Sequence, residues 1–199
     1  MLSSRMASSF PVALHLEGKP CLVIGQNREA AERALALRDA GAVVLVISRE
    51  PDSELTEILE REAFRVERRA FVPADLDGKW LAVLTDRDPE LGRAMADEAL
   101  SRRVLFCATD QATPNSYSHM ALARAGLVTV AIGTNGRAPA LGRRLREEFS
   151  RLFAAANLGD FAARLAALRD ATPERLRREV LGAAVAEVRI EGRIELPGE

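Results

Sequence analysis

Short apolar runs and longer amphipathic segments alternate through the first half of the chain. Apolar runs of four or five residues without a polar break are typical of parallel strands covered on both faces. The segments between them carry apolar residues at helical spacing, and Gly41 closes the first while Pro89 opens the last. The pattern predicts helices at 28–40, 52–62 and 89–102, and strands at 21–24, 43–47, 64–68, 81–84 and 104–107.

This alternation predicts an α/β fold built on a doubly wound, Rossmann-type parallel sheet. We expect its first strand–helix–strand unit to cross over in the right-handed sense, as nearly all such units do. A chain of 199 residues is long enough for one such domain and a smaller addition.

The pattern changes after the last of these strands. An amphipathic turn of helix is predicted at 120–122, followed by a strand at 127–132. Pro139 then opens a helix whose arginines face away from its apolar positions, which are Leu141, Leu145, Phe149 and Leu152.

The last part of the chain is rich in Ala, Arg, Leu and Glu. This composition predicts two or three helices over 154–184, interrupted near Asn157 and restarted at Pro173. Residues 188–196 alternate weakly between apolar and charged positions, so they are either a strand or a loose tail.

Charge and composition narrow the class of protein. A net charge of −1 argues against nonspecific binding to nucleic acid. No apolar run approaches the roughly 18 residues that a membrane-spanning helix needs, and residues 1–9 are too polar for a secretory signal. Cys21 and Cys107 lie in apolar runs outside any Cys-x-x-Cys motif, so we expect reduced core cysteines, no structural zinc site and a cytoplasmic location.

The turn after the first strand is the first candidate site. Dinucleotide-binding folds favour glycine here, because the backbone and the helix N-terminus then approach the pyrophosphate. Gly25 is present, but Gln26 and Asn27 follow it, and the side chain of Asn27 takes up space that a phosphate needs. Arg49, after the second strand, is either a partner for a 2′-phosphate or a solvated loop charge, and Thr85 follows the fourth strand. The turn is therefore either an NAD(P) site or a purely structural turn.

Asp110 is the second candidate, because it follows the fifth predicted strand. A carboxylate at the end of a strand can act as a general base, or it can simply begin an Asx turn. His119 lies nine residues further on. It is either an ordinary polar residue or, with Asp110, a transient metal-handling pair.

The third candidate is the loop and helix start that follow the strand at 127–132. Backbone N–H groups, a hydroxyl and guanidinium groups suit a ligand rich in carboxylates, although a solvated basic helix face is the alternative. The residues concerned are Thr134, Asn135, Gly136, Arg137, Arg143 and Arg144.

Asp110, the loop at 134–136 and the run at 138–146 resemble the N-terminal region of siroheme synthase, the precorrin-2 dehydrogenase and sirohydrochlorin ferrochelatase family. Members typically show an Asp after a strand and then Ser-Gly-Gly-x-Ser-Pro-x-Leu-Ala before an Arg-rich helix. The resemblance covers residues 10 to about 153. The turn after the first strand departs from the family pattern. Members have three consecutive glycines where this chain has Gly25, Gln26 and Asn27.

The resemblance implies an enzyme of porphyrin and siroheme biosynthesis. As an oxidoreductase, it would oxidise precorrin-2 to sirohydrochlorin with NAD or NADP. As a lyase, it would insert Fe²⁺, which is a substrate, into sirohydrochlorin. Asp110 would be the acid–base catalyst, with His119 near the metal. The anionic tetrapyrrole would bind at 134–137, Arg143 and Arg144, and the cofactor at Gly25, Gln26, Asn27, Arg49 and Thr85.

The resemblance also implies a homodimer that pairs through 115–148. It divides the chain into a nucleotide-binding domain at 1–113, a dimerisation segment at 114–149 and a helical C-terminal domain at 150–199. Two alternatives stay open. One is a chelatase or tetrapyrrole-binding member that no longer uses nicotinamide, and the other is a noncatalytic dimeric partner protein. No methyltransferase domain is expected.

Overall fold

The computed structural model describes residues 9–111 and 114–196. Two predictions therefore lie largely outside the described residues. They are the absence of a secretory signal in residues 1–9 and the domain boundary at residue 113. The chain forms two compact units, Ser9–Ser118 and the part from His119 onwards. The finer division into three domains stays a prediction.

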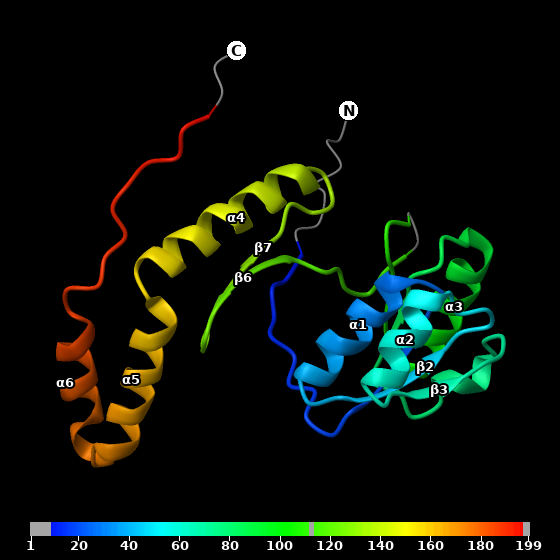
Figure 1. The fold of residues 1–199 in the computed structure, drawn as a ribbon, viewed down its shortest axis with the longest axis horizontal. Coiled ribbons are helices and arrows are strands. Elements are labelled where there is room, and N and C mark those ends of the chain that lie inside the picture. Colours follow the sequence, from blue (N-terminus) through cyan, green and yellow to red (C-terminus); the bar gives the residue numbers. More distant parts are fainter. Residues whose placement is uncertain (1–8, 112–113, 197–199) are drawn as a thin grey trace. The chain divides into compact units, whose positions relative to one another are not determined.

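The first unit is built on a five-stranded parallel sheet with the order β3-β2-β1-β4-β5 (Figure 1). The strands fall within about one residue of the predicted positions, because four of the five are mostly buried apolar runs, whereas the edge strand β3 is only partly buried. They are β1 (Pro20–Ile24), β2 (Val43–Ile47), β3 (Arg65–Glu67), β4 (Leu81–Leu84) and β5 (Leu105–Ala108).

Helices cover both faces of this sheet, so the predicted doubly wound fold is confirmed. Side chains of β1 alternate between two cores: Cys21 and Val23 belong to one, Leu22 and Ile24 to the other. The first core also contains residues of α1 (Arg28–Asp39) and α2 (Ser53–Arg61). The second contains residues of α3 (Pro89–Arg102) and of the 3₁₀ helix η1 (Pro73–Leu76).

Each of these three α-helices begins at a capping side chain. The side-chain oxygens of Asn27, Asp52 and Asp88 accept hydrogen bonds from backbone N–H groups two or three residues further on, at 2.7–3.0 Å. Such caps satisfy donors that have no partner within the helix. They fix where each helix leaves the strand end before it.

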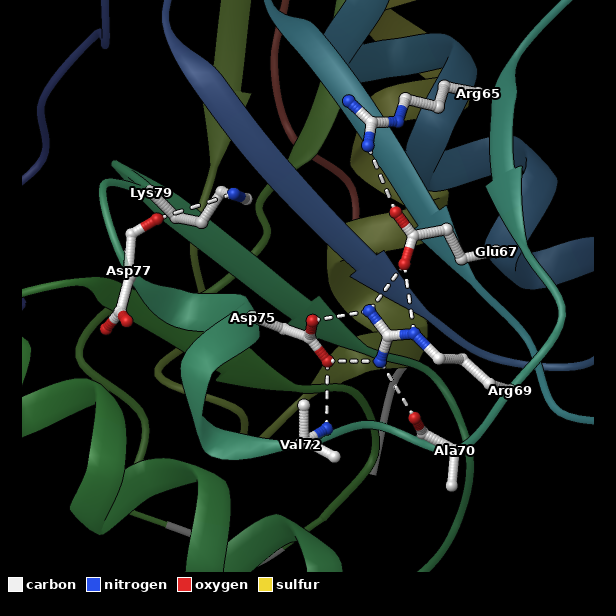
Figure 2. A network of polar contacts seen from close by, with 8 residues as sticks. All are labelled: Arg65, Glu67, Arg69, Ala70, Val72, Asp75, Asp77 and Lys79. Atoms are coloured by element: carbon white, nitrogen blue, oxygen red, sulfur yellow. Dashed lines mark hydrogen bonds and ion pairs between the residues drawn. The ribbon is translucent and has the colours of Figure 1, made fainter.

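A partly buried ion pair holds the long crossover from β3 to β4, which contains only η1 (Figure 2). The Arg69 guanidinium donates to both carboxylate oxygens of Asp75, at 2.6 and 2.8 Å, and to Glu67 Oε2 at 3.0 Å. The backbone N–H of Val72 also donates to Asp75, at 2.8 Å. The Asp75 side chain is 9% exposed, and the next residue, Leu76, is fully buried in the core. The pair therefore anchors the crossover where it enters the core.

The second unit joins a β-hairpin to three helices. Strands β6 (Ala121–Ala125) and β7 (Val128–Ile132) pair antiparallel, and α4 (Pro139–Ala155) lies along them (Figure 1). Helices α5 (Leu158–Ala171) and α6 (Glu174–Val185) follow, as the composition predicted. Gly126 turns the hairpin with a φ of 55°, and a Cβ there would lie 3.3 Å from the backbone of Gly159. Glycine is therefore required by both the turn and the approach of α5.

The predicted turn of helix at 120–122 is wrong, because these residues enter β6. Ala121, Ala123 and Ala125 alternate with exposed neighbours, and Ala123 is fully buried. The two-residue turn at 126–127 sets Ala125 opposite Val128, so strand pairing overrides the helical preference of alanine.

The helix predicted from Pro139 is present, but its inner face is rotated from the expected one. Leu141 and Leu152 are exposed, whereas Gly142 and Phe153 are buried. A Cβ on Gly142 would lie 3.6 Å from the Thr134 side chain, so α4 packs closely on the hairpin at this glycine. The predicted apolar stripe is therefore only partly correct.

The second unit has a thin core. In its described part, Ala123 and Phe153 are the buried hydrophobic side chains, and neither α5 nor α6 has a buried residue. Residues 188–196 form no strand, so the loose tail is the alternative that the structure shows.

We expect Asp75→Asn to lower the free energy of unfolding by about 1–3 kcal/mol at pH 7, because it leaves part of the Arg69 charge unpaired. Burial raises the pKa of Asp75, but hydrogen bonds from Arg69 and Val72 outweigh it and hold that pKa below its usual value. The carboxylate therefore stabilises the fold above the unfolded pKa of about 3.9, and this contribution is lost as the pH falls through the lower folded pKa.

Urea unfolding at pH 7 and in steps below pH 4 checks this expectation, since the difference between parent and variant should shrink in acid. Asp77→Asn is the matched control: Asp77 is exposed and pairs with Arg102 at 2.8 Å, so its loss should cost less than about 0.5 kcal/mol. Equal effects of the two substitutions would contradict the role given to Asp75.

Candidate functional site

The strand order creates a topological switch point at the carboxyl edge of the sheet, between β1 and β4. Strand β1 leads into α1 on one face, whereas its neighbour β4 leads into α3 on the other. Open α/β sheets bind ligands at such a switch point, outside the carboxyl ends of the strands. The turns that follow β1, β2, β4 and β5 all begin at this edge.

Gly25 and Thr85, both predicted cofactor residues, meet at this switch point. The backbone N–H of Thr85 donates to Ile24 O at 2.8 Å, and its hydroxyl donates to the same oxygen at 3.3 Å. A Cβ on Gly25 would overlap Thr85 Oγ1 and would lie 2.9 Å from the Cβ of Ala30. Only glycine lets the turn pass between β4 and the start of α1.

Gln26 reaches from the turn after β1 to the turn after β4 and bonds to a residue that the sequence did not single out. Its Nε2 donates to Asp86 Oδ2 at 3.0 Å, while its backbone oxygen accepts from Asp52 N at 2.8 Å. Gln111, from the loop after β5, donates to Asp86 O at 2.8 Å. Asp86 thus joins the turns after three strands, and its only signal in the sequence is its position after Thr85.

Asn27 has an extended backbone, with a φ of −133°, and caps α1. Its Oδ1 accepts from Glu29 N at 3.0 Å, so the carboxamide already occupies one of the donors at the helix start. A phosphate that approaches α1 would have to share these donors with Asn27.

Several buried polar groups at this edge have no hydrogen-bond partner within the described residues. They are Ser48 Oγ after β2, Thr109 Oγ1 after β5 and Gln111 Oε1. Buried polar groups without partners are uncommon in native proteins, and a bound polar ligand is one way to satisfy them. Together with the close turn at Gly25 and the 12-residue helix behind it, these groups fit a dinucleotide cofactor.

Asp110 lies at the end of β5, as predicted, in a left-handed conformation with a φ of 52°. Its carboxylate is 70% exposed and accepts a hydrogen bond from Arg87 Nη2 at 3.0 Å. Asn115 fixes the loop around it, because its side chain exchanges two hydrogen bonds with the backbone of Ala108, at 2.8 and 3.2 Å. The carboxylate is therefore accessible, and Arg87 is a neighbour that sequence reasoning missed.

The two cysteines and the nearby tyrosine are unsuited to act as nucleophiles or bases. Burial raises the pKa of Cys21 and of Cys107 to about 11, and it raises the pKa of Tyr117 further above its ordinary value. Both thiols are free and protonated at neutral pH.

The predicted substrate loop forms a tight turn between β7 and α4. Asn135 and Gly136 are both left-handed, with φ of 50° and 70°, and Arg137 N donates to Thr134 O at 3.0 Å. No side chain caps the start of α4, where Ala138 precedes Pro139. Backbone donors at this helix start therefore remain for an anionic group.

The arginines of α4 differ in their surroundings. Arg144 pairs with Glu148 at 2.5 Å, whereas Arg143 has no ion pair within the described residues. Arg143 is thus the better placed of the two to attract an anion.

These groups belong to different units. Gly25, Gln26, Asn27, Arg49, Thr85 and Asp110 lie in the first, whereas His119 and the loop at 134–137 lie in the second. A common site for Asp110, His119 and this loop stays a prediction. Among residues 9–111 and 114–196, no three His, Cys, Asp or Glu side chains gather as a metal site would, and no helix is long and apolar enough to cross a membrane.

Comparisons with known proteins agree with the α/β fold described above. A family model described as "Putative NAD(P)-binding" matches residues 12–121. Siroheme synthase of Chromobacterium violaceum is 32% identical over 166 residues, which are 83% of this chain and 35% of that protein. Siroheme synthase 1 of Cronobacter sakazakii is 32% identical over 160 residues, 80% of this chain and 34% of that protein. The chain thus spans about a third of the length of the curated relatives it matches.

A solved structure titled "SirC, precorrin-2 dehydrogenase" has the same fold. It superposes with a TM-score of 0.74 at 20% identity, and the match covers 90% of each chain.

We expect Gly25→Ala to lower the free energy of unfolding by about 1–3 kcal/mol, because the added Cβ overlaps Thr85 Oγ1. Adding Thr85→Ala should recover part of this loss, since it removes the overlapping hydroxyl. Urea unfolding of the two single variants and the double variant gives the interaction between the two positions. Strictly additive losses would show that the two residues are not in contact.

Proposed function

Because this chain belongs to the family described as "Putative NAD(P)-binding", we propose that it is a precorrin-2 dehydrogenase of siroheme biosynthesis. The proposed reaction oxidises precorrin-2 to sirohydrochlorin, with NAD or NADP as the acceptor. The observation that carries the proposal is the glycine turn against Thr85 at the switch point, in a chain whose relatives are named siroheme synthase.

In this proposal the carboxyl edge of the sheet binds the dinucleotide. Gly25 brings the backbone close to the pyrophosphate, and the start of α1 contributes N–H donors and the positive end of the helix dipole. The hydroxyls of Ser48 and Thr109 gain a polar partner when the site is filled. A dinucleotide held there would supply the acceptor for the hydride that leaves the substrate.

Asp110 is the proposed general base. The oxidation removes a hydride and a proton, and an exposed carboxylate can take the proton. Arg87, whose Nη2 donates to this carboxylate at 3.0 Å, orients it.

The proposed partner of the second unit is the tetrapyrrole itself. Its carboxylates suit the uncapped start of α4, the left-handed turn at 135–136 and the guanidinium of Arg143. Thr134, Arg137 and Arg144 line the same loop and helix and are proposed as secondary contacts.

Insertion of Fe²⁺ is the second candidate activity, favoured by the exposure of Asp110. Metal insertion releases two protons from the macrocycle, and an accessible carboxylate can accept each in turn and pass it to bulk water. His119 is the proposed ligand that handles the incoming ion. The iron is a substrate in this reaction.

We also propose a homodimer and a cytoplasmic location. The second unit buries few apolar side chains by itself, and Leu127 and Leu141 are exposed beside β7 and on α4. A second copy that covers 115–148 would supply the missing burial. Both cysteines are free and buried, which suits a reducing compartment.

Asp110→Asn tests the catalytic assignment. Asn tolerates the left-handed backbone but cannot take a proton, so sirohydrochlorin formation should fall by roughly 10²-fold or more. Binding of precorrin-2 should change little, because other groups hold its carboxylates. The control is Asp39→Asn, which removes a similarly exposed carboxylate near an arginine, 3.7 Å from Arg38. If the Asp110→Asn variant folds and turns over like the parent, Asp110 is only a turn residue.

Multi-angle light scattering tests the dimer. We expect a particle of twice the 21.7 kDa chain mass at micromolar concentration. A mass of 21.7 kDa alone would reject the dimer and, with it, the proposed role of 115–148.

A further inference from the structure

The last described segment, residues 188–196, is a tail that follows α6 and belongs to neither sheet (Figure 1). Its large apolar side chains are all exposed to solvent, which is unfavourable. They are Val188 at 57%, Ile190 at 72%, Ile194 at 77% and Leu196 at 75% exposed. The proposed reaction uses none of them.

Apolar and charged residues alternate along this tail. In an extended chain the apolar residues and Gly192 lie on one side, and the charged residues lie on the other. Two ion pairs between residues i and i+2 agree with this arrangement: Arg189 with Glu191 at 3.0 Å, and Arg193 with Glu195 at 2.7 Å. Because both pairs are exposed they contribute little, so they can be exchanged for pairs with another chain.

The order of the charges makes the tail complementary to a second copy of itself. When two tails run antiparallel with Gly192 opposite Gly192, every cation faces an anion and every large apolar side chain faces another. The opposed pairs are Arg189–Glu195, Glu191–Arg193, Ile190–Ile194 and Val188–Leu196. Cross-strand pairs of both kinds stabilise antiparallel strands.

Other alignments of two tails lose this match. A shift of one tail by two residues, or a parallel pairing in register, sets like charges opposite each other. A shift by one residue sets charged side chains against the apolar side. A shift by four residues restores the charge match but leaves part of the segment unpaired. The sequence therefore favours one two-fold arrangement, in which the same surface of both copies is used.

We propose that residues 188–196 pair antiparallel with the same residues of a second copy, in the register that centres on Gly192. The tail is not a strand in the single chain, and it becomes one when its backbone N–H and C=O groups gain partners in the second copy. A Cβ built on Gly192 would have nothing within 4 Å, so a second strand can approach the centre.

A two-stranded ribbon by itself is only marginally stable in water, so a further contact must hold the two tails close together. The proposed homodimer through 115–148 would supply that contact. The inference therefore rests on the proposed dimer, but it does not depend on the proposed reaction.

Disulfide cross-linking of the full-length chain tests the register. Ile190→Cys and Ile194→Cys, each on its own tagged copy, are co-expressed and equilibrated in a glutathione buffer. Opposed residues lie about 4.5–5.5 Å apart between Cα atoms, which suits a disulfide. The mixed pair should therefore cross-link at least about tenfold more efficiently than either variant with itself, whose cysteines would lie about 13 Å apart along the ribbon. Cys21 and Cys107 are buried, with pKa values raised to about 11, so they should not interfere.

Charge reversal is the matched control. Arg189→Glu with Arg193→Glu, placed in both copies, leaves only acids on the charged side and should abolish the selective cross-link. Glu191→Arg with Glu195→Arg in one of the two copies should restore it, because every acid again faces a cation.

The outcomes separate this inference from the proposed dimer when light scattering is run on the same samples. Equal cross-linking of the mixed pair and of Ile190→Cys alone would overturn the register and, with it, the inference. No cross-link in a particle of twice the 21.7 kDa chain mass would overturn the inference and leave the dimer in place. No cross-link and a mass of 21.7 kDa would overturn both.

Discussion

The close approach of the Gly25 backbone to Thr85 is the contact on which the rest of the carboxyl edge depends. It brings the turn after β1 within van der Waals reach of β4 and seats the first turn of α1 against both. The Gln26–Asp86 bond, the cap at Asn27 and the placing of residues 48–52 all follow from the path of this turn. A larger residue at position 25 would move every one of them.

Most of the sheet could be predicted from the sequence because four of its strands are mostly buried and appear as unbroken apolar runs, unlike the edge strand β3. The hairpin could not, since a strand of alternating alanines has the composition of a helix, and its pairing depends on a turn formed later in the chain. The inner face of α4 was misjudged for a related reason. Its contact is set by a glycine, which carries no hydrophobic signal.

The candidate site residues also differ in whether the sequence alone could identify them. Those directly after a strand, such as Gly25 and Asp110, could be picked out because strand ends define the ligand-binding edge. Asp86 and Arg87 could not, because their roles come from partners 60 and 23 residues away in the chain. Nor could local sequence show that the Ser48 hydroxyl is buried without a hydrogen-bond partner among the described residues.

The small hydrophobic core of the second unit affects how stably that unit is folded. Helices that bury no side chain gain little from their own domain, and isolated helices of 12–14 residues are marginal in water. In the proposed homodimer a second copy would contribute to the free energy that keeps this unit folded, and by mass action that contribution would rise with protein concentration. How much of the unit is folded would then depend on the amount of protein made, as well as on its sequence.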